Sequence, residues 1–222
     1  ESKMSAPRQN CLIVLSSAKE GVSAASFIQA FTLTHTTFTV QLATPGGKAV
    51  DYVNQDDNSR RWLNDFRTKA FSMPISLDAI EPNRYSALLI PCAPGAISDL
   101  ANSPQLAIII NNFVAEKKPI CAIGLGVSAL CCARKDGGDW SLKDYSLTST
   151  SVFELARSVD FANLQIIPED FIKDNGGTYS CSKPDCVHVV IDQHIITGQN
   201  EQSTLTSVQN LILLCNQRQG KK

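Results

Sequence analysis

The chain has 222 residues, of which 43% are hydrophobic and 18% are charged, and its net charge at neutral pH is -1. This length fits one domain with a full hydrophobic core. The near-neutral charge argues against direct binding of nucleic acid, and the lack of a long acidic run argues against a disordered chain. The composition is therefore typical of a soluble globular protein.

The first ten residues are polar and contain no apolar segment, so we expect 1–10 to be a disordered or tag-like terminus and not a signal peptide. No run of about 18 apolar residues occurs, which predicts no insertion into a membrane. The eight cysteines lack CxxC spacing, so we expect reduced thiols, no metal and no cofactor. We place the folded domain at 11–216 and a polar tail at 217–222.

The first half of the chain has the pattern of a strand-helix-strand unit followed by a polar excursion. The apolar run CLIVL is typical of an interior strand of a parallel sheet. In chain order, we expect a strand at 11–15, a helix at 22–34, a strand at 38–43, a turn at 44–47, a short helix at 58–67 and a strand at 86–91.

The second half continues the alternation of strands and helices. Pro104 follows Ser103 and starts a helix, whose apolar stripe runs through Leu106, Ile109 and Ile110. We further expect strands at 119–123, 164–167 and 186–191, a short strand within 145–152, and a last short strand and loop over 195–200. A last helix is expected at 203–215 with Leu205, Val208 and Leu211 inward. This order predicts a single-domain α/β fold with a mostly parallel sheet and helices on both faces.

The stretch 119–132 (PICAIGLGVSALCC) is the centre of the functional argument. It reads as a buried strand that breaks at Gly124-Leu125-Gly126 and continues as a helix. A tight turn of this kind displays a nucleophile at the carboxyl edge of a sheet, where the loops at Ser16 and Cys92 also converge. The residue at the apex is Gly124, which has no side chain to do chemistry.

Several segments resemble the PfpI-type superfamily of class I glutamine amidotransferase-like proteins. They are the run YSALLIP at 85–91, the tripeptide PGA at 94–96, the elbow, the TPGG turn at 44–47 and ITGQN at 196–200. The segments 20–24, 43–49, 129–133 and 187–190 resemble one branch, the glutamine amidotransferase-like class I domain-containing proteins. The resemblance implies a flavodoxin-like fold over residues 11–215.

The resemblance also implies where catalytic residues would lie, and this chain departs from that pattern. Enzymatic members carry a cysteine at the apex, an acidic residue after the first strand and a histidine on a later loop. These positions fall on Gly124, Ser23 and Thr150, with Glu20 three residues before Ser23. Losing the nucleophile removes covalent catalysis, so we expect a pseudoenzyme.

A residual pocket remains under this interpretation. The resemblance places the oxyanion-binding amides around Gly95 and Leu125, and Glu20 and Cys92 would complete the lining. Two alternatives stay open. One is a cysteine-dependent hydrolase or glyoxalase-like enzyme that uses Cys92 or Cys121, although burial would make the Cys121 thiol unreactive. The other is a small-molecule binding module. For the candidate bases, His35, His188 and His194, a structural role is favoured.

The branch resemblance finally implies a cellular role. Its members look like homo-oligomeric subunits, tetrameric or dimeric, of an assembly that acts as an effector of an early-endosome Rab GTPase and links messenger RNA to endosomes. We therefore expect other protein subunits of an endosomal complex as partners. We expect no direct contact with nucleic acid, and a cytoplasmic location peripheral to early endosomes.

Overall fold

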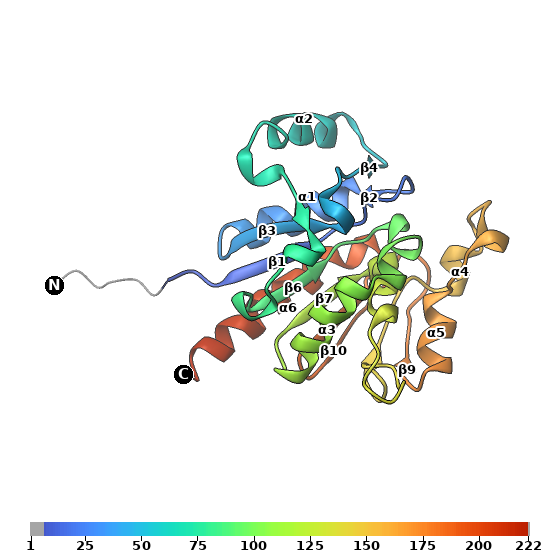
Figure 1. Ribbon diagram of the computed structural model, residues 1–222. Helices are drawn as coiled ribbons and strands as arrows, with labels where there is room; N and C mark the ends of the chain where they lie inside the picture. The colour runs from blue at the N-terminus through green and yellow to red at the C-terminus, as the bar shows by residue number, and fades with distance from the viewer. Residues whose placement is uncertain (1–6, 222) are drawn as a thin grey trace.

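The computed structural model describes residues 7–221, and its centre is a seven-stranded sheet (Figure 1). Its strands are β1 (Asn10–Val14), β3 (Thr39–Thr44), β5 (Ile75–Ser76), β6 (Ala87–Ile90), β7 (Ile120–Ile123), β10 (Val189–Asp192) and β11 (Ile195–Gly198). They lie in the order β10-β11-β7-β6-β1-β3-β5, and every pairing is parallel except that of β10 with β11. The predicted fold class is confirmed.

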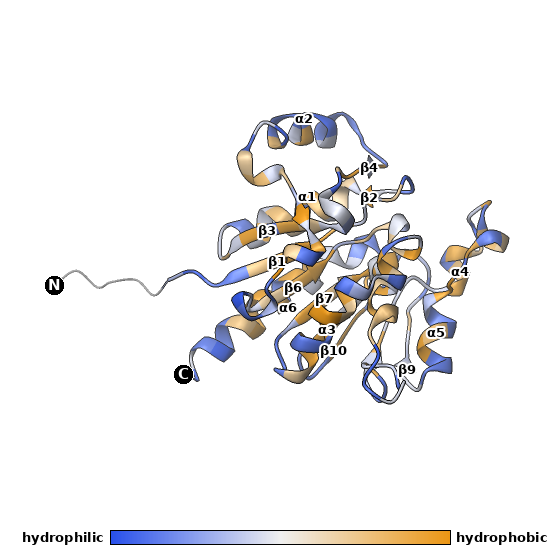
Figure 2. Ribbon diagram, viewed as in Figure 1, coloured by the Kyte–Doolittle hydropathy of each residue, from blue (hydrophilic) through white to orange (hydrophobic). Residues whose placement is uncertain are grey.

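Helices cover both faces of this sheet. The α-helices within residues 7–221 are α1 (Ala24–His35), α2 (Asp57–Phe66), α3 (Pro104–Ala115), α4 (Val152–Leu155), α5 (Pro168–Asp174) and α6 (Thr204–Gln219). Helices α1 and α6 pack together on one face, whereas α3 and the 3₁₀ segment after β7 cover the other (Figure 1). Apolar residues gather on the sheet and on the inner sides of the helices, and hydrophilic residues line the outside of α2 and α5 (Figure 2).

Short elements connect these layers. Two small parallel pairs lie outside the main sheet: β2 (Val22–Ser23) with β4 (Tyr52–Val53), and β8 (Ser146–Leu147) with β9 (Thr178–Tyr179). The 3₁₀ helices are Pro45–Gly47, Ala70–Ser72, Leu77–Ala79, Pro82–Arg84, Pro94–Ile97, Leu100–Asn102, Gly124–Cys132, Phe161–Asn163 and Glu201–Ser203.

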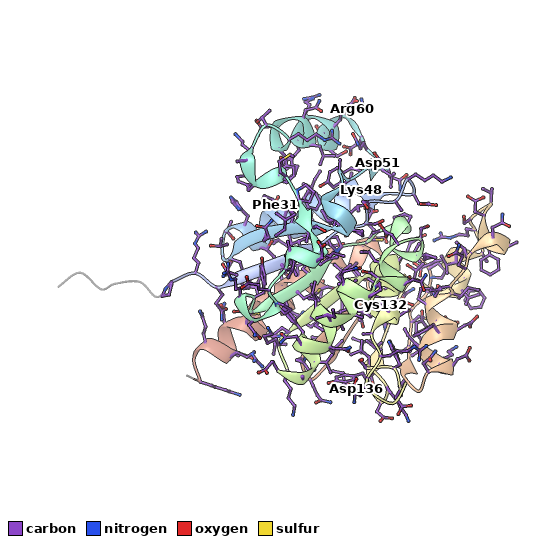
Figure 3. The ribbon with its side chains drawn as sticks, in the orientation of Figure 1. Phe31, Lys48, Asp51, Arg60, Cys132 and Asp136 are labelled. Atoms are coloured by element: carbon purple, nitrogen blue, oxygen red, sulfur yellow. The ribbon has the colours of Figure 1, made fainter. Side chains whose placement is uncertain are left out.

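Local sequence explains the main elements. The Ser103 hydroxyl caps α3 by accepting a hydrogen bond from the Leu106 amide, and Pro104 occupies the first turn. The predicted stripe on α3 is buried against the sheet. Helix α2 packs on α1 through aromatic rings, with 4.9 Å between the ring centres of Phe31 and Phe66. Figure 3 shows Phe31 between α2 and the sheet, while Arg60 points outward from α2.

In the second half of the chain, the strand predicted at 164–167 is wrong, whereas the short strand expected within 145–152 is present. Residues 164–167 form no strand, because Pro168 starts α5 directly behind them and places Glu169 and Asp170 in its first turn. Of 145–152, only Ser146–Leu147 is extended, since Ser151 caps α4. The sequence thus contains a helix start signal at each place, the Ser151 cap for α4 and Pro168 for α5.

The elbow and the last helix also differ from expectation. The segment after β7 is a 3₁₀ helix and not an α-helix. Leu205 is exposed, because Thr204, Ser207 and Val208 form the buried face of α6. Helix α6 ends at Gln219, so the expected boundary at 216 falls inside it.

At the other end of the chain, Asn10 already pairs with Thr39 in the sheet. Of the expected terminal segment 1–10, residues 1–6 lie outside the described residues. None of the helices within 7–221 has the length and hydrophobicity that a membrane-spanning segment requires.

Candidate functional site at the carboxyl edge of the sheet

Gly124 stands at the carboxyl end of β7 with φ of +57°. This left-handed conformation suits glycine and matches the strained apex of a nucleophile elbow. Two residues later, a Cβ at Gly126 would collide with the carbonyl oxygen of Pro91. The segment therefore lies directly on the end of β6, and the tighter 3₁₀ winding accompanies this close approach.

The sulfur of Cys92 occupies the space beside the apex. A Cβ built on Gly124 would lie 2.6 Å from Cys92 Sγ and 3.4 Å from Thr150 Oγ1. The first distance is far inside van der Waals contact, so a side chain at the apex has no room unless Cys92 moves. The structure thus brings together the apex, the loop after β6 and the position expected for the histidine.

Cys92 is held by its backbone and kept neutral by burial. Its amide donates to Ser26 Oγ (3.0 Å), and its carbonyl accepts from the Ser23 amide (2.9 Å). Burial raises the pKa of the Cys92 thiol to about 12; the Leu125 amide offsets part of that rise, and Glu201 adds to it. Because the thiolate is the nucleophilic form of cysteine, Cys92 is poorly reactive at neutral pH.

Ser23, at the expected acidic position, contacts a carboxylate that comes from another part of the chain. Its hydroxyl donates to Glu201 Oε2 at 2.6 Å and also accepts from the Ser26 amide, which caps α1. Glu20, which we had assigned to the residual pocket, is exposed on the turn before Gly21. Sequence reasoning missed Glu201, although it follows β11 and therefore belongs to the same sheet edge as Gly124.

The expected oxyanion donor at Gly95 is engaged within the fold. The Gly95 amide donates to the Gly21 carbonyl at 2.9 Å. The nearby loop after β1 is held by Asp99, which accepts from the Ser16 hydroxyl and the Ser17 amide, both at 2.9 Å. Of the two expected amides, Gly95 is thus unavailable, and the Leu125 amide lowers the pKa of the Cys92 thiol.

A buried carboxylate, Glu154, organises the border of this site. Its Oε1 accepts from the Ser151 amide (3.0 Å) and hydroxyl (2.9 Å) and from Gln199 Nε2 (2.8 Å). Its Oε2 accepts from Asn200 Nδ2 (3.1 Å) and the Asp185 amide (3.2 Å). Burial alone would raise the pKa of Glu154, but these hydrogen bonds outweigh it and hold the pKa below its usual value. The capping-box spacing from Ser151 was the signal that could have revealed this residue.

The other candidate residues lie elsewhere. Cys121 is fully buried in β7, and burial raises the pKa of its thiol. His194 bridges the Tyr145 hydroxyl (2.7 Å) and the Lys118 carbonyl (2.8 Å) before β11 begins, at the opposite edge of the sheet. His188 lies between two serine hydroxyls, and His35 stacks on the Phe31 ring.

These contacts limit what the carboxyl edge can do. Its cysteine is protonated, and its carboxylates, Glu154, Glu201 and Asp99, are each hydrogen-bonded within the fold. Within residues 7–221, no group of three or more His, Cys, Asp or Glu side chains is arranged to hold a metal ion. The edge therefore presents a filled elbow and not an activated nucleophile.

Solved structures share the fold of this chain. The chain superposes on Rapid Encystment Protein 24 KDa of Francisella tularensis with a TM-score of 0.84 and 20% identity, covering 93% of this chain and 99% of that one. It superposes on glyoxalase III of Candida albicans with a TM-score of 0.79 and 19% identity, covering 93% and 97%. At these identities the similarity establishes the shared fold alone.

Sequence comparison gives a nearer relationship. No protein-family model matches the chain. It is 54% identical to the Xenopus laevis glutamine amidotransferase-like class 1 domain-containing protein 1 over 211 residues, covering 95% of this chain and 92% of that one. The Homo sapiens protein of the same name is 52% identical, with coverage of 95% and 96%. The chain therefore belongs to the family of glutamine amidotransferase-like class 1 domain-containing proteins, as the sequence motifs indicated.

Proposed function

We propose that this protein is a non-catalytic scaffold built on a glutamine amidotransferase-like domain. One observation carries the proposal: the elbow apex is Gly124, and the place of its missing side chain is taken by Cys92 Sγ, 2.6 Å from a Cβ built there. Covalent catalysis at an elbow needs a nucleophile with a base or a lowered pKa. Gly124 offers no nucleophile, and Cys92 has a raised pKa.

The second part of the proposal rests on the resemblance to the family branch described from the sequence. We infer that the chain is a homo-oligomeric subunit, tetrameric or dimeric, of an early-endosome Rab-effector assembly that links messenger RNA to endosomes. In this proposal it is cytoplasmic and peripheral to the endosome surface. The net charge of -1 shows no overall basic surplus, so in this proposal other subunits make the direct contact with RNA.

An alternative activity has one observation in its favour. Cys92 touches the apex position, and the fold neighbour from Candida albicans is a glyoxalase III. A glyoxalase-like reaction at Cys92 would need its thiolate, which burial disfavours. A small-molecule binding module at the same edge is the remaining alternative.

Turnover and labelling test the catalytic question. We expect the protein to consume methylglyoxal no faster than a Cys92→Ser variant does. Mild iodoacetamide should modify the exposed Cys181 and Cys186 before Cys92. A fast-reacting Cys92, lost together with turnover in Cys92→Ser, would replace the scaffold proposal with the hydrolase or glyoxalase alternative.

Assembly needs separate experiments. Light scattering coupled to size-exclusion chromatography should give a mass of two or four chains. A pull-down on an early-endosomal Rab GTPase should recover the protein together with other subunits when the GTPase carries GTP, and not when it carries GDP. A monomer that is recovered equally in both nucleotide states would contradict the proposed role.

A further inference from the structure

A cavity of about 400 Å³ opens at the amino edge of the sheet, opposite the Gly124 elbow. Figure 1 shows the start of β1 and the end of α6 on this same side of the molecule. The lining comes from four segments that are far apart in the sequence: the residues just before β1, β6 and β7, and the last turn of α6. A cavity of this size lies within the range of small-molecule sites.

Four cationic side chains line this cavity, which we call the amino-edge cavity: Arg8, Arg84, Lys118 and Arg218. None of the residues between 7 and 221 that line it is acidic. Among the four, only Arg84 has an ion pair within the described residues, with Glu81 at 2.7 Å on the exposed side. This concentration of positive charge contrasts with the net charge of -1 for the whole chain.

The other three cations bond to neutral backbone oxygens. Arg8 donates to the His35 carbonyl (3.3 Å), Lys118 to the Pro82 carbonyl (2.9 Å), and Arg218 to the carbonyl of Lys117. A guanidinium has five N–H donors and an ammonium has three, so each group keeps donors for another acceptor. These bonds position the cations without neutralising them.

The position of Arg218 near the end of α6 is expected from the helix dipole, but the dipole does not explain the whole group. Lys118 precedes β7 and is partly buried. Burial lowers the pKa of Lys118, the charge of Glu116 offsets part of that decrease, and the charge of Arg218 adds a smaller decrease. Lys118 and Arg218 line the same cavity with like charges, and an anion bound between them would reduce their repulsion.

We propose that the amino-edge cavity binds a compact anion that carries at least two phosphate groups. Forked guanidiniums bind phosphate oxygens in pairs, and a lysine adds a point charge, so three arginines and one lysine suit several phosphate oxygens at once. A soluble inositol phosphate and the headgroup of a phosphoinositide share this chemistry. The inference is independent of the proposed scaffold function, since it concerns the opposite edge of the sheet.

Calorimetric titration with inorganic pyrophosphate and with inositol 1,4,5-trisphosphate tests the site. We expect saturable binding that weakens as salt rises, and an affinity about tenfold lower in Arg8→Gln and in Arg218→Gln. Arg61→Gln is the matched control, because Arg61 is exposed on α2 and outside the cavity lining. All three variants should unfold at the same temperature as the parent, since the substituted side chains are exposed.

Vesicles distinguish the two sources of phosphate. Cosedimentation with phosphatidylcholine vesicles that contain a phosphoinositide, lost in Arg218→Gln, would assign a lipid headgroup. Binding of the soluble probes without vesicle binding would assign a free phosphate compound. No binding of any probe at about millimolar concentration, or equal weakening by Arg61→Gln and Arg218→Gln, would overturn the proposal.

Discussion

The charged side chains at the two edges of the central sheet differ in their hydrogen-bond partners. At the carboxyl edge, Glu154 accepts five hydrogen bonds from protein groups, and Glu201 accepts one from Ser23. At the amino edge, the hydrogen bonds that Lys118 and Arg218 donate go to backbone carbonyls, and Lys118 also lies over the Phe113 ring. One edge is closed by its own side chains, whereas the other keeps hydrogen-bonding capacity for a ligand.

This difference matters for interpreting a degenerate enzyme fold. Open α/β sheets bind ligands at their carboxyl edge, and the family motifs direct attention there. In this chain that edge is filled by Cys92, and its expected oxyanion donor at Gly95 is already bonded. The free donors lie at the edge that fold analogy would pass over, because a fold alone does not determine function.

The largest effect should come from removing the buried carboxylate at the closed edge. Glu154→Ala should lower the free energy of unfolding by about 3–5 kcal/mol, because the Asp185 N–H and one N–H of each of the Gln199 and Asn200 side-chain amides lose their acceptor. Urea unfolding followed by circular dichroism measures it. Glu154→Gln keeps the shape and should lose clearly less.

The same carboxylate predicts the direction in which folding stability changes with pH. Its pKa is held below the usual value in the folded state, so its stabilising contribution is present above the unfolded pKa of about 4.3 and disappears as pH falls through the folded pKa. Urea midpoints between neutral and acidic pH should fall more steeply for the parent than for Glu154→Gln. Parallel curves would mean that the network does not favour the charged carboxylate.

The filled elbow predicts the next largest effect. Gly124→Cys should destabilise the protein by about 2–4 kcal/mol, of which about 1–2 comes from the left-handed φ and the rest from overpacking against Cys92. Gly46→Cys isolates the first part, because Gly46 has φ of +67° and its nearest neighbour is 3.6 Å from a built Cβ.

The same substitution can also be measured in a protein that carries Cys92→Ala. In that protein, Gly124→Cys should lower the free energy of unfolding by little more than the contribution of the left-handed φ, since the sulfur that blocks the apex is gone. A Gly124→Cys protein as stable as the parent would show that the apex is open and that the two edges do not differ in this respect.

A smaller effect is expected at the hydroxyl that meets Glu201. Ser23→Ala removes the cap of α1 and the 2.6 Å bond to Glu201, and should reduce the free energy of unfolding by about 1–2 kcal/mol. Ser103→Ala removes the cap of α3 without a carboxylate partner and serves as the control in the same denaturation assay. Equal losses would mean that the contact with Glu201 adds no stability.

The smallest effect belongs to the open edge. Arg218→Gln should change the free energy of unfolding by no more than about 0.5 kcal/mol, because the side chain is exposed and has no carboxylate partner within residues 7–221. The urea assay used for Glu154 measures it. A loss comparable to that of Glu154→Ala would show that the cations at the amino edge hold the fold together, and the contrast between the edges would disappear.

Much of the framework followed from local sequence patterns. The continuous apolar run of β1, the Ser103-Pro104 start of α3 and its stripe each report the burial of one element, and the structure confirms them. Motif resemblance located Gly124 at the apex of a strand-to-helix turn. These features could be predicted because periodicity and capping depend on neighbours within a few residues.

The chemistry of both edges was decided by tertiary structure. Ser23 meets Glu201 across 178 positions of the chain, and the donors of the amino-edge cavity come from before β1, before β7 and from the end of α6. No local pattern encodes these meetings, because they depend on the order β11-β7-β6-β1 in the sheet. Sequence alone determined that Gly124 carries no nucleophile. Only the packing of strands and helices decided that Cys92 fills its place and that four cations, of which only Arg84 is ion-paired within residues 7–221, gather at the opposite edge.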